Sequence, residues 1–261
     1  MALVRIDHVP QTVKVNIPLS VILPDPGAMG DIPVRSRKVL YLLHGISGDA
    51  GAWHRYTIVE TLAAAYGLVV VMPSVGRSFY TDLPNGQLYF TYLTEELPKY
   101  LKDVFGIAPR REDTMIAGNS MGGYGAFKAA LLRPERYAAA ASFSGVLSMA
   151  ILTAVPDDPR RQEFTLLFGD LDSLAGSEHD PAVWLRRAAE RAAAAAPVPR
   201  LYISVGRQED LYPLSTEFHS ECMKLGVPAE YHEDDGGHNW FLWDKEIRLF
   251  LAETLGPVPD N

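Results

Sequence analysis

The sequence has almost no cysteine: Cys222 is the single one among 261 residues. One thiol cannot form a disulfide within the chain, and no pair of cysteines offers the spacing of a zinc site. A disulfide-stapled fold is therefore excluded, and we expect neither a metal nor a cofactor. With 48% hydrophobic residues, the chain can bury a large core instead.

Long apolar runs and blocks of like charge are also missing. No apolar run approaches the roughly 18 residues that span a bilayer, and residues 1–8 lack the basic start and apolar core of an export signal. The 24 basic and 32 acidic residues give a net charge of −8, without a basic block. Nucleic acid and membrane are therefore excluded as partners, and we expect a cytoplasmic location.

The periodicity of apolar residues predicts a mostly parallel sheet covered by helices on both faces. Apolar residues alternate over 13–23, which is typical of a half-buried, antiparallel first strand. Short continuous apolar runs follow, as in strands buried on both faces, and helix-like segments separate them. The runs cover 39–43, 68–72, 114–117, 138–143 and 201–205, and the helix-like segments cover 56–66, 92–105, 122–132, 214–225 and 244–255.

One segment interrupts this rhythm. Residues 145–199 contain closely spaced prolines, a Gly-Asp turn and an alanine-rich helix predicted from about 181 to 196. We therefore expect a single α/β domain over 1–261, with a helical insertion at about 145–199. Ligands of such folds bind at the carboxyl ends of the strands, so the chemistry is expected there.

The strongest chemical signal is the pentapeptide from Gly118 to Gly122, with Ser120 at its centre. An apolar strand precedes it and a helical pattern follows, which is the context of a nucleophile elbow. A side chain at either glycine would collide with the adjoining strand or helix. The sequence thus predicts that Ser120 projects above the sheet at the amino end of a helix.

A neutral serine needs a base, and the base needs an acid to orient it. In this fold class the acid and then the histidine follow the serine along the chain. His238 lies in a glycine-containing loop before the last helix, so it is the expected base. Asp210, on the loop after the strand at 201–205, is the expected acid, and Glu209 is its local rival.

Two backbone N–H groups are expected to bind the oxyanion. One belongs to Met121, the residue after the nucleophile, and the other to Ile46, because Gly45 lets the preceding loop turn inward. His44 precedes that turn without a second ligand at metal spacing, so we expect a structural role for it.

With these segments identified, the sequence resembles the esterase D family of α/β-hydrolases, in its tributyrin and acetyl esterase-like branch. The resemblance implies the α/β-hydrolase fold and a serine carboxylesterase that hydrolyses short-chain acyl esters without a cofactor. It places nucleophile, acid and base on Ser120, Asp210 and His238. The matching segments are 41–45 with Trp53 downstream, 70–74, 80–82, 95–98, 118–126, 142–145 and 237–240.

Several alternatives stay open. S-formylglutathione hydrolases look similar around the serine but usually carry a Cys-Thr pair in the oxyanion loop, where this chain has Ile46-Ser47-Gly48-Asp49. Mycolyltransferases share the architecture but are exported. Acetylxylan and feruloyl esterases, or a non-catalytic binding protein with the same fold, also agree with the pattern.

Aromatic side chains are the expected walls of an apolar acyl pocket for a small-molecule ester. A cramped pocket of this kind favours acetyl to butyryl groups. The sequence leaves open the physiological ester and whether the chain forms a homo-oligomer. The candidates for the pocket are Trp53, Tyr124, Phe143, Trp184 and Trp240.

Overall fold

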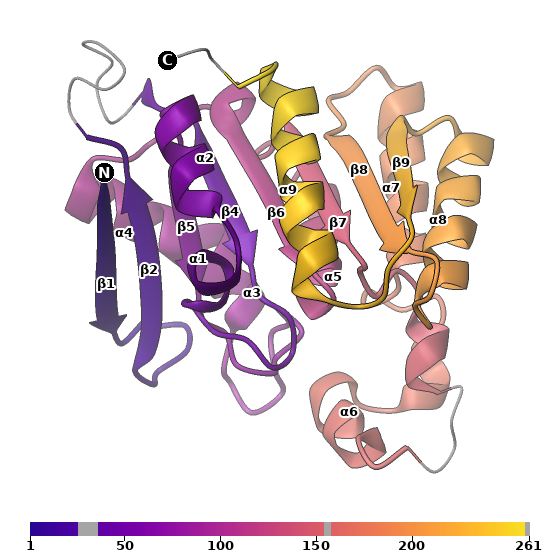
Figure 1. Cartoon of the computed structure of the whole chain (residues 1–261). Coiled ribbons are helices and arrows are strands. Elements are labelled where there is room, and N and C mark those ends of the chain that lie inside the picture. Colours follow the sequence, from indigo (N-terminus) through magenta and orange to yellow (C-terminus); the bar gives the residue numbers. More distant parts are fainter. Residues whose placement is uncertain (26–35, 154–157, 259–261) are drawn as a thin grey trace.

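A single sheet organises the chain (Figure 1). The structure, a computed structural model, describes residues 1–25, 36–153 and 158–258. The described part contains an 8-stranded sheet in the order β1-β2-β5-β4-β6-β7-β8-β9. The strands are β1 (Ala2–His8), β2 (Ile17–Leu23), β4 (Val39–Leu43), β5 (Val69–Pro73), β6 (Thr114–Asn119), β7 (Ala139–Phe143), β8 (Arg200–Gly206) and β9 (Ala229–Asp234).

The strands from β5 across to β9 run parallel, whereas β1 and β2 are antiparallel additions at one edge. The antiparallel start is therefore confirmed. The first strand was expected over 13–23, but β2 begins only at Ile17. The N–H groups of Val13 and Lys14 both donate to the carbonyl of Pro10, and because of this turn the strand starts later than expected. The edge strand β1 was not predicted, because its side chains are only partly buried.

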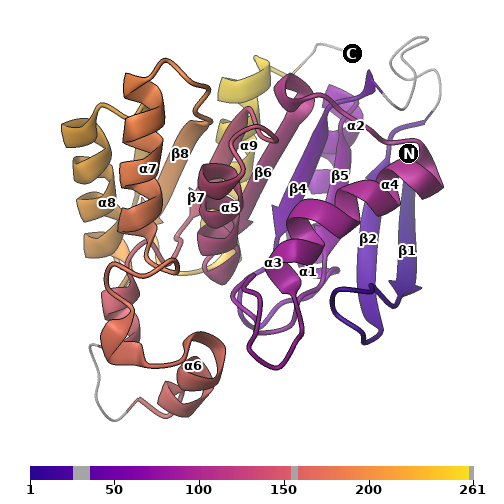
Figure 2. The ribbon, with the colours of Figure 1, turned by 180° about the vertical axis from the view of Figure 1, so that it is seen from behind.

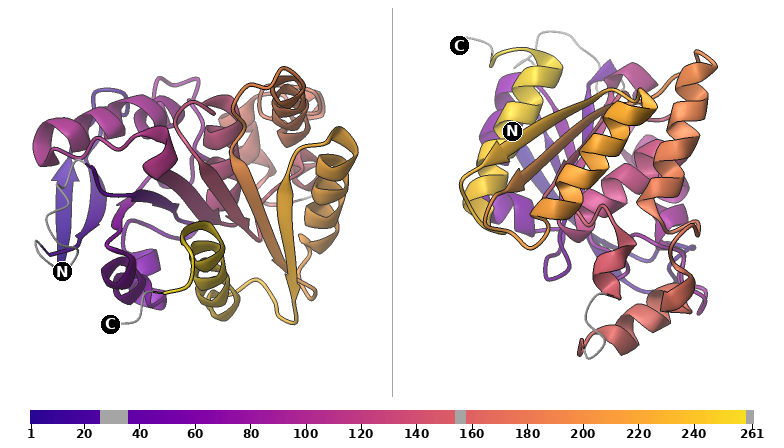
Figure 3. Two further views of the ribbon diagram at one scale, coloured as in Figure 1. Left: turned by 90° about the horizontal axis from the view of Figure 1, so that it is seen from above. Right: turned by 90° about the vertical axis from the view of Figure 1, so that its right-hand side faces the viewer.

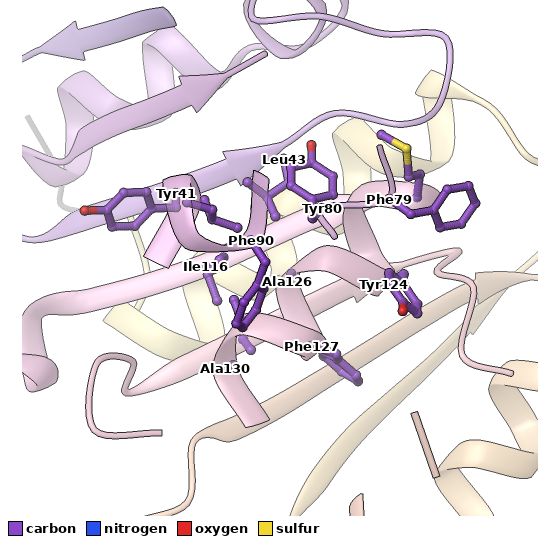
Figure 4. Packing of buried hydrophobic residues seen from close by; sticks show 14 of the residues in the cluster. Tyr41, Leu43, Phe79, Tyr80, Phe90, Ile116, Tyr124, Ala126, Phe127 and Ala130 are labelled. Atoms are coloured by element: carbon purple, nitrogen blue, oxygen red, sulfur yellow. The ribbon is translucent and has the colours of Figure 1, made fainter. Parts of the chain in front are cut away.

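Helices cover both faces of the sheet, as predicted (Figures 1 and 2). Helices α1, α2 and α9 bury their apolar sides in one hydrophobic cluster, and α4, α5, α7 and α8 bury theirs in the other. Figure 4 shows part of the second cluster, with α5 residues packed on the sheet. The helices are α1 (Ala52–Tyr56), α2 (Val59–Tyr66), α3 (Tyr89–Thr91), α4 (Leu97–Phe105), α5 (Met121–Leu132), α6 (Arg161–Phe168), α7 (Pro181–Ala193), α8 (Tyr212–Leu225) and α9 (Trp240–Leu255).

The segment between β7 and β8 forms a cap at one end of the sheet. Its helix α6 extends beyond the carboxyl ends of the central strands, whereas α7 packs beside α5 (Figure 3). The alanine-rich helix was expected to reach residue 196 but ends at Ala193, because Ala195 adopts a φ of 54°. Residues 154–157 of the expected insertion lie outside the described residues. No helix in the described ranges is long and apolar enough to cross a bilayer.

Candidate active site

Ser120 occupies the sharp turn that the sequence predicts between β6 and α5. Its backbone has φ 54° and ψ −119°, a conformation that is unfavourable for a residue with a side chain. The turn closes because its flanking residues are glycines. A Cβ on Gly118 would lie 2.5 Å from the carbonyl carbon of Gly122, and one on Gly122 would lie 2.4 Å from the carbonyl oxygen of Leu43. The hydroxyl therefore stands at the amino end of α5, whose dipole favours negative charge.

His238 lies in the loop between β9 and α9 and is paired with a carboxylate. Its Nδ1 is 2.7 Å from Oε2 of Glu209. The Glu209 side chain is fully buried, whereas the imidazole is 38% exposed. Oε1 of Glu209 accepts hydrogen bonds from the N–H of Gly206 at 2.9 Å and from the hydroxyl of Ser144 at 2.7 Å. The carboxylate is thus held from one side and presents its other oxygen to the imidazole.

Asp210, the acid expected from the sequence, does not hold His238. Its side chain is exposed, and among the described residues the histidine bonds only to Glu209. The tight turn after β8 is the reason: the N–H of Gly206 holds the Glu209 carboxylate, whereas Asp210 is exposed and lines a cavity beside Ser120 and His238. The expected pair of Asp210 with His238 is therefore corrected to Glu209 with His238.

Ser120 and His238 meet where two cavities adjoin. The first, here called the cap-side cavity, has a volume of about 360 Å³. The second, here called the α9-side cavity, has a volume of about 380 Å³. Ile46, Ser120 and His238 line both of them. No direct hydrogen bond joins the serine to the histidine in the described ranges, and such contacts often tighten only when substrate binds.

The two cavities differ in chemistry. The cap-side cavity has mainly apolar walls. Of its charged side chains, Arg160 is paired with Asp158 at 2.7 Å, and Asp210 supplies a carboxylate. The α9-side cavity combines aromatic rings with polar side chains. The apolar walls of the first come from Phe79, Val146, Ile151, Leu152, Phe164 and Leu211, and the second is lined by Ser47, Tyr56, Asn119, Asn239, Trp240 and Trp243, among others.

The loop after β4 brings its backbone close to the nucleophile. A Cβ on Gly45 would lie 3.5 Å from the Cβ of Ser120, so the glycine permits this approach. Ile46 and Met121 both line the cap-side cavity. Neither of their N–H groups donates a loop or turn hydrogen bond within the described residues. Two backbone donors are thus available beside the hydroxyl.

Of the aromatic residues expected to form the pocket, only Trp240 lines either cavity. Trp53 packs edge-on behind it, with ring centroids 5.1 Å apart, and is itself buried. Tyr124 and Trp184 pack against each other in the core at 5.0 Å, and Phe143 is buried against Trp53. These expectations were wrong, because large rings also fill the core. Phe79 and Phe164 were missed. Phe79 lies on a loop, and for Phe164 periodicity does not show which side of the cap helix faces the cavity.

No group of three or more His, Cys, Asp or Glu side chains suited to a metal ion occurs among the residues that the structure describes. His44, for which a structural role was expected, is buried. Its ring nitrogens contact the carbonyl of Gly45 and the N–H of Val75. Burial lowers the pKa of His44, which favours its neutral form.

Comparisons with known proteins identify a family. Residues 11–253 match the family described as "Putative esterase". An acetyl esterase of Caldicellulosiruptor saccharolyticus is 30% identical over 257 residues, which is 95% of this chain and 96% of that protein. An S-formylglutathione hydrolase of Paracoccus denitrificans (strain Pd 1222) is 26% identical over 202 residues, 69% of this chain and 67% of that protein.

Solved structures agree with the sequence relatives. FphF, a fluorophosphonate-binding serine hydrolase of Staphylococcus aureus, superposes with a TM-score of 0.87 at 31% identity, covering 99% of both chains. The S-formylglutathione hydrolase FrmB of the same organism gives a TM-score of 0.85 at 31% identity, covering 97% of this chain and 98% of that one. The fold is therefore that of the α/β-hydrolases. The chain belongs to this esterase family and is a serine esterase, a carboxylic ester hydrolase.

Proposed function

We propose that the protein hydrolyses short-chain acyl esters through a Ser-His-Glu triad, as a member of the tributyrin and acetyl esterase-like branch of the esterase D family. Ser120 attacks the ester carbonyl, and His238 accepts the hydroxyl proton. Glu209 holds the imidazole in the tautomer whose Nε2 is free and stabilises the imidazolium that forms. The alcohol leaves with that proton, and water then hydrolyses the acyl-enzyme by the same route.

The backbone N–H groups of Ile46 and Met121 bind the oxyanion in this proposal. Both residues line the cavity beside the serine hydroxyl, and Met121 begins α5. The first N–H groups of a helix have no partner inside it, so the Met121 donor is available to a developing negative charge. Removing a donor of this kind typically costs about 10²-fold or more in rate.

The cap-side cavity is the proposed acyl pocket. Its apolar walls suit a hydrocarbon chain. Arg160 is paired with Asp158, and the other charged side chain of the lining, Asp210, is acidic, so the cavity does not favour an anionic acyl group. The rings of Phe79 and Phe164 pack edge to face at 5.9 Å in its wall and limit the length of the chain. Acetyl to butyryl esters are therefore the expected substrates.

The observation that carries the proposal is the 2.7 Å contact between Nδ1 of His238 and Oε2 of Glu209, beside the strained turn of Ser120. A buried carboxylate behind an imidazole, with a serine at the same cavities, is the arrangement that general-base activation requires. A non-catalytic binding protein with the same fold would not require this arrangement of serine, imidazole and carboxylate.

Rates of hydrolysis of p-nitrophenyl esters from acetyl to dodecanoyl test the proposal. The native protein is expected to prefer acetyl to butyryl, and Ser120→Ala to lose activity by at least about 10³-fold. Equal, background-level rates for both proteins would favour the binding protein. A preference for dodecanoyl would contradict the short acyl pocket.

A thioester is the second candidate substrate. The 31% identity to FrmB over nearly the whole chain supports S-formylglutathione, whereas the loop from Ile46 to Asp49 lacks the usual Cys-Thr pair. Parallel kcat/KM measurements on S-formylglutathione, alkyl acetates, acetylated xylan and methyl ferulate separate these substrates. The proposal predicts the highest value for the alkyl acetates.

A further inference from the structure

The first part of the loop between β5 and α3, residues 74–82, contacts both the proposed acyl pocket and the loop that carries Ile46. Phe79 lines the cap-side cavity. The hydroxyl of its neighbour, Tyr80, donates a hydrogen bond to the carbonyl oxygen of His44 at 3.0 Å. The N–H of Val75 donates to Nε2 of His44 at 3.1 Å. The proposed chemistry does not itself account for these contacts.

The backbone of this loop is strained where it meets the site. Phe79 and Tyr80 have φ values of 51° and 50°, in the left-handed region that residues with a side chain seldom adopt. Such strain persists only where the surroundings enforce it, and it concentrates at functional sites. Figure 4 shows the Tyr80 ring beside Leu43 and the Phe79 ring pointing away from it. The Tyr80 side chain thus contacts the loop after β4, whereas the Phe79 side chain lines the cap-side cavity.

The Tyr80 ring packs in a space that the absence of a side chain on Gly125 leaves open. It is fully buried against α5, and a Cβ on Gly125 would lie 2.4 Å from its Cδ2 atom. A phenylalanine would fill this space equally well. The hydroxyl therefore needs its own explanation, and its partner, the His44 carbonyl, is that explanation.

The hydrogen bonds of His44 define its tautomer. The N–H of Val75 can only donate, so Nε2 accepts and Nδ1 carries the proton of the neutral ring. Nδ1–H then donates to the carbonyl oxygen of Gly45, which lies 2.7 Å away. The N–H of Gly48 donates to the same oxygen at 2.9 Å. Two donors therefore fix the direction of the Gly45 carbonyl.

This carbonyl belongs to the same peptide unit as the N–H of Ile46. No cis peptide bond occurs in the described residues, so this unit is trans. The C=O and N–H of a trans peptide point in opposite directions within one plane. Fixing the Gly45 carbonyl on the side of His44 consequently fixes the Ile46 N–H on the other side.

We infer that Tyr80 and His44 are positioning residues that aim the Ile46 N–H at the oxyanion. The inference rests on the proposed function, since it takes Ile46 as an oxyanion donor. Tyr80 holds the His44 backbone, and the His44 ring holds the Gly45–Ile46 peptide. Because Phe79 lies next to Tyr80 in the same strained loop, the wall of the acyl pocket and the oxyanion donor are held in a fixed relation.

Tyr80→Phe tests the first link. With p-nitrophenyl butyrate, kcat is expected to fall by about tenfold to a hundredfold, a fraction of what losing an oxyanion donor costs, with KM within about twofold. Inhibition by butylboronic acid, whose serine adduct is tetrahedral, is expected to weaken by a similar factor. Tyr66→Phe is the matched control, because its hydroxyl also donates to a backbone carbonyl, that of Gly256 at 3.0 Å, remote from the site. It is expected to leave both quantities unchanged.

A kcat and a boronate affinity for Tyr80→Phe within twofold of the native values would overturn the inference. A fall in kcat without loss of boronate affinity would overturn it as well, because a misdirected oxyanion donor must weaken both. A purely structural role lowers the melting temperature without moving the boronate affinity.

His44→Asn and His44→Gln test the second link, and they decide the question if Tyr80→Phe does not fold. The asparagine amide can place an N–H near the position of Nδ1 and keep the bond to Gly45, whereas the glutamine amide lies nearer the position of Nε2. His44→Asn is therefore expected to retain at least about fivefold more kcat than His44→Gln. Equal losses would contradict the inference.

Ser120→Ala in the same assays separates failure of the proposed function from failure of the positioning inference. If Ser120→Ala is inactive and Tyr80→Phe behaves like the native protein, the proposed function stands and the positioning inference fails. If Ser120→Ala keeps full activity, the proposed function itself fails.

Discussion

Gly122 is the residue on which the geometry of the nucleophile turn depends most closely. Its missing side chain lets α5 start against β4, where a Cβ would lie 2.4 Å from the carbonyl oxygen of Leu43. Backbone atoms on both sides leave no flexible group to move aside. Any larger residue must therefore displace the helix or the strand.

Gly122→Ala is consequently expected to destabilise the fold by at least about 1–3 kcal/mol, the usual cost of overpacking. Gly236→Ala is the control, because nothing lies within 4 Å of its added Cβ. Urea unfolding of the two variants measures the difference. Equal midpoints for both would show that the turn is less crowded than the structure indicates.

At the residue scale the sequence predicted most of the site. Ser120 and His238 follow from the glycine pattern and from the order of elements, and the structure places both at the same cavities. The carboxylate did not follow in the same way. Glu209 and Asp210 are adjacent on one tight turn, and spacing alone does not reveal which side chain the Gly206 N–H captures.

Helix α6 gives the proposed acyl pocket part of its wall. Phe164 faces the cap-side cavity and packs on Phe79, whereas Leu166 on the same helix is 71% exposed. The bidentate pair of Arg77 with Glu163 joins α6 to the loop after β5. The cap thus presents one ring to the cap-side cavity and is fixed to the rest of the site.

Phe164→Ala is expected to shift the chain-length preference upward, because it removes a ring from the wall of the pocket. The ratio of kcat/KM for p-nitrophenyl octanoate to that for the acetate should rise by about tenfold, since each added methylene that can be buried contributes about 0.8 kcal/mol. Leu166→Ala should leave the ratio unchanged. An unaltered ratio in Phe164→Ala would place the acyl chain elsewhere.

Helix α9 contains a buried acid that the proposed chemistry does not use. Glu246 is 1% exposed, and its Oε2 accepts a hydrogen bond from the hydroxyl of Tyr202 at 2.8 Å. Burial raises the pKa of Glu246. The folded state therefore holds this proton to a higher pH than the unfolded chain does, and stability falls as the pH rises from the ordinary glutamate pKa to the raised one.

Glu246→Gln removes this ionisation and keeps an oxygen that can accept from Tyr202. Above the raised pKa the variant should be more stable than the native protein, by up to about 1.4 kcal/mol for each unit of elevation. The difference should disappear as the pH falls to about 4. Thermal melts at pH 4 and pH 8 measure it, and a less stable variant at pH 8 would contradict the assignment.

At the scale of elements, periodicity missed the edge strand β1 but predicted the buried strands and the helices that cover the sheet. These segments are buried on one or both faces, so their apolar pattern is strong. The cap was predicted only as an insertion. The side of α6 that faces the cap-side cavity depends on contacts with the remote residues Phe79 and Arg77, and the local pattern does not contain this information.

Lys128 on α5 is a lysine buried in the interior of the described part of the molecule. It is 5% exposed, donates to the hydroxyl of Thr81 at 2.6 Å and lies over the rings of Phe90 and Tyr124. Burial lowers the pKa of Lys128 to about 7. The unfolded chain therefore binds this proton more tightly, and global stability should rise as the pH increases from about 7 toward 10.

Lys128→Met is expected to be more stable than the native protein at pH 6 to 7, by more than about 1 kcal/mol, because it avoids burying a charge. The advantage should shrink as the pH rises to 9, where the native lysine is neutral in the fold. Lys99→Met, at an exposed position on α4, should show no such trend. A constant difference between pH 6 and pH 9 would contradict the account.

The fold as a whole brings together groups that lie far apart in the sequence. Ser120 follows β6, Glu209 follows β8 and His238 follows β9, and parallel strands direct their carboxyl ends to one edge of the sheet. The α/β alternation was sufficient to predict this edge. The contact between His238 and Glu209 is the detail on which the proposed mechanism depends.

The values of kcat/KM for Glu209→Gln and Asp210→Asn on p-nitrophenyl acetate test this contact most directly. Loss of the carboxylate behind the imidazole is expected to lower kcat/KM by about 10³-fold or more in Glu209→Gln. Asp210→Asn should stay within about threefold of the native protein, because that side chain is exposed and does not bond to His238. The reverse order of losses would contradict the mechanism.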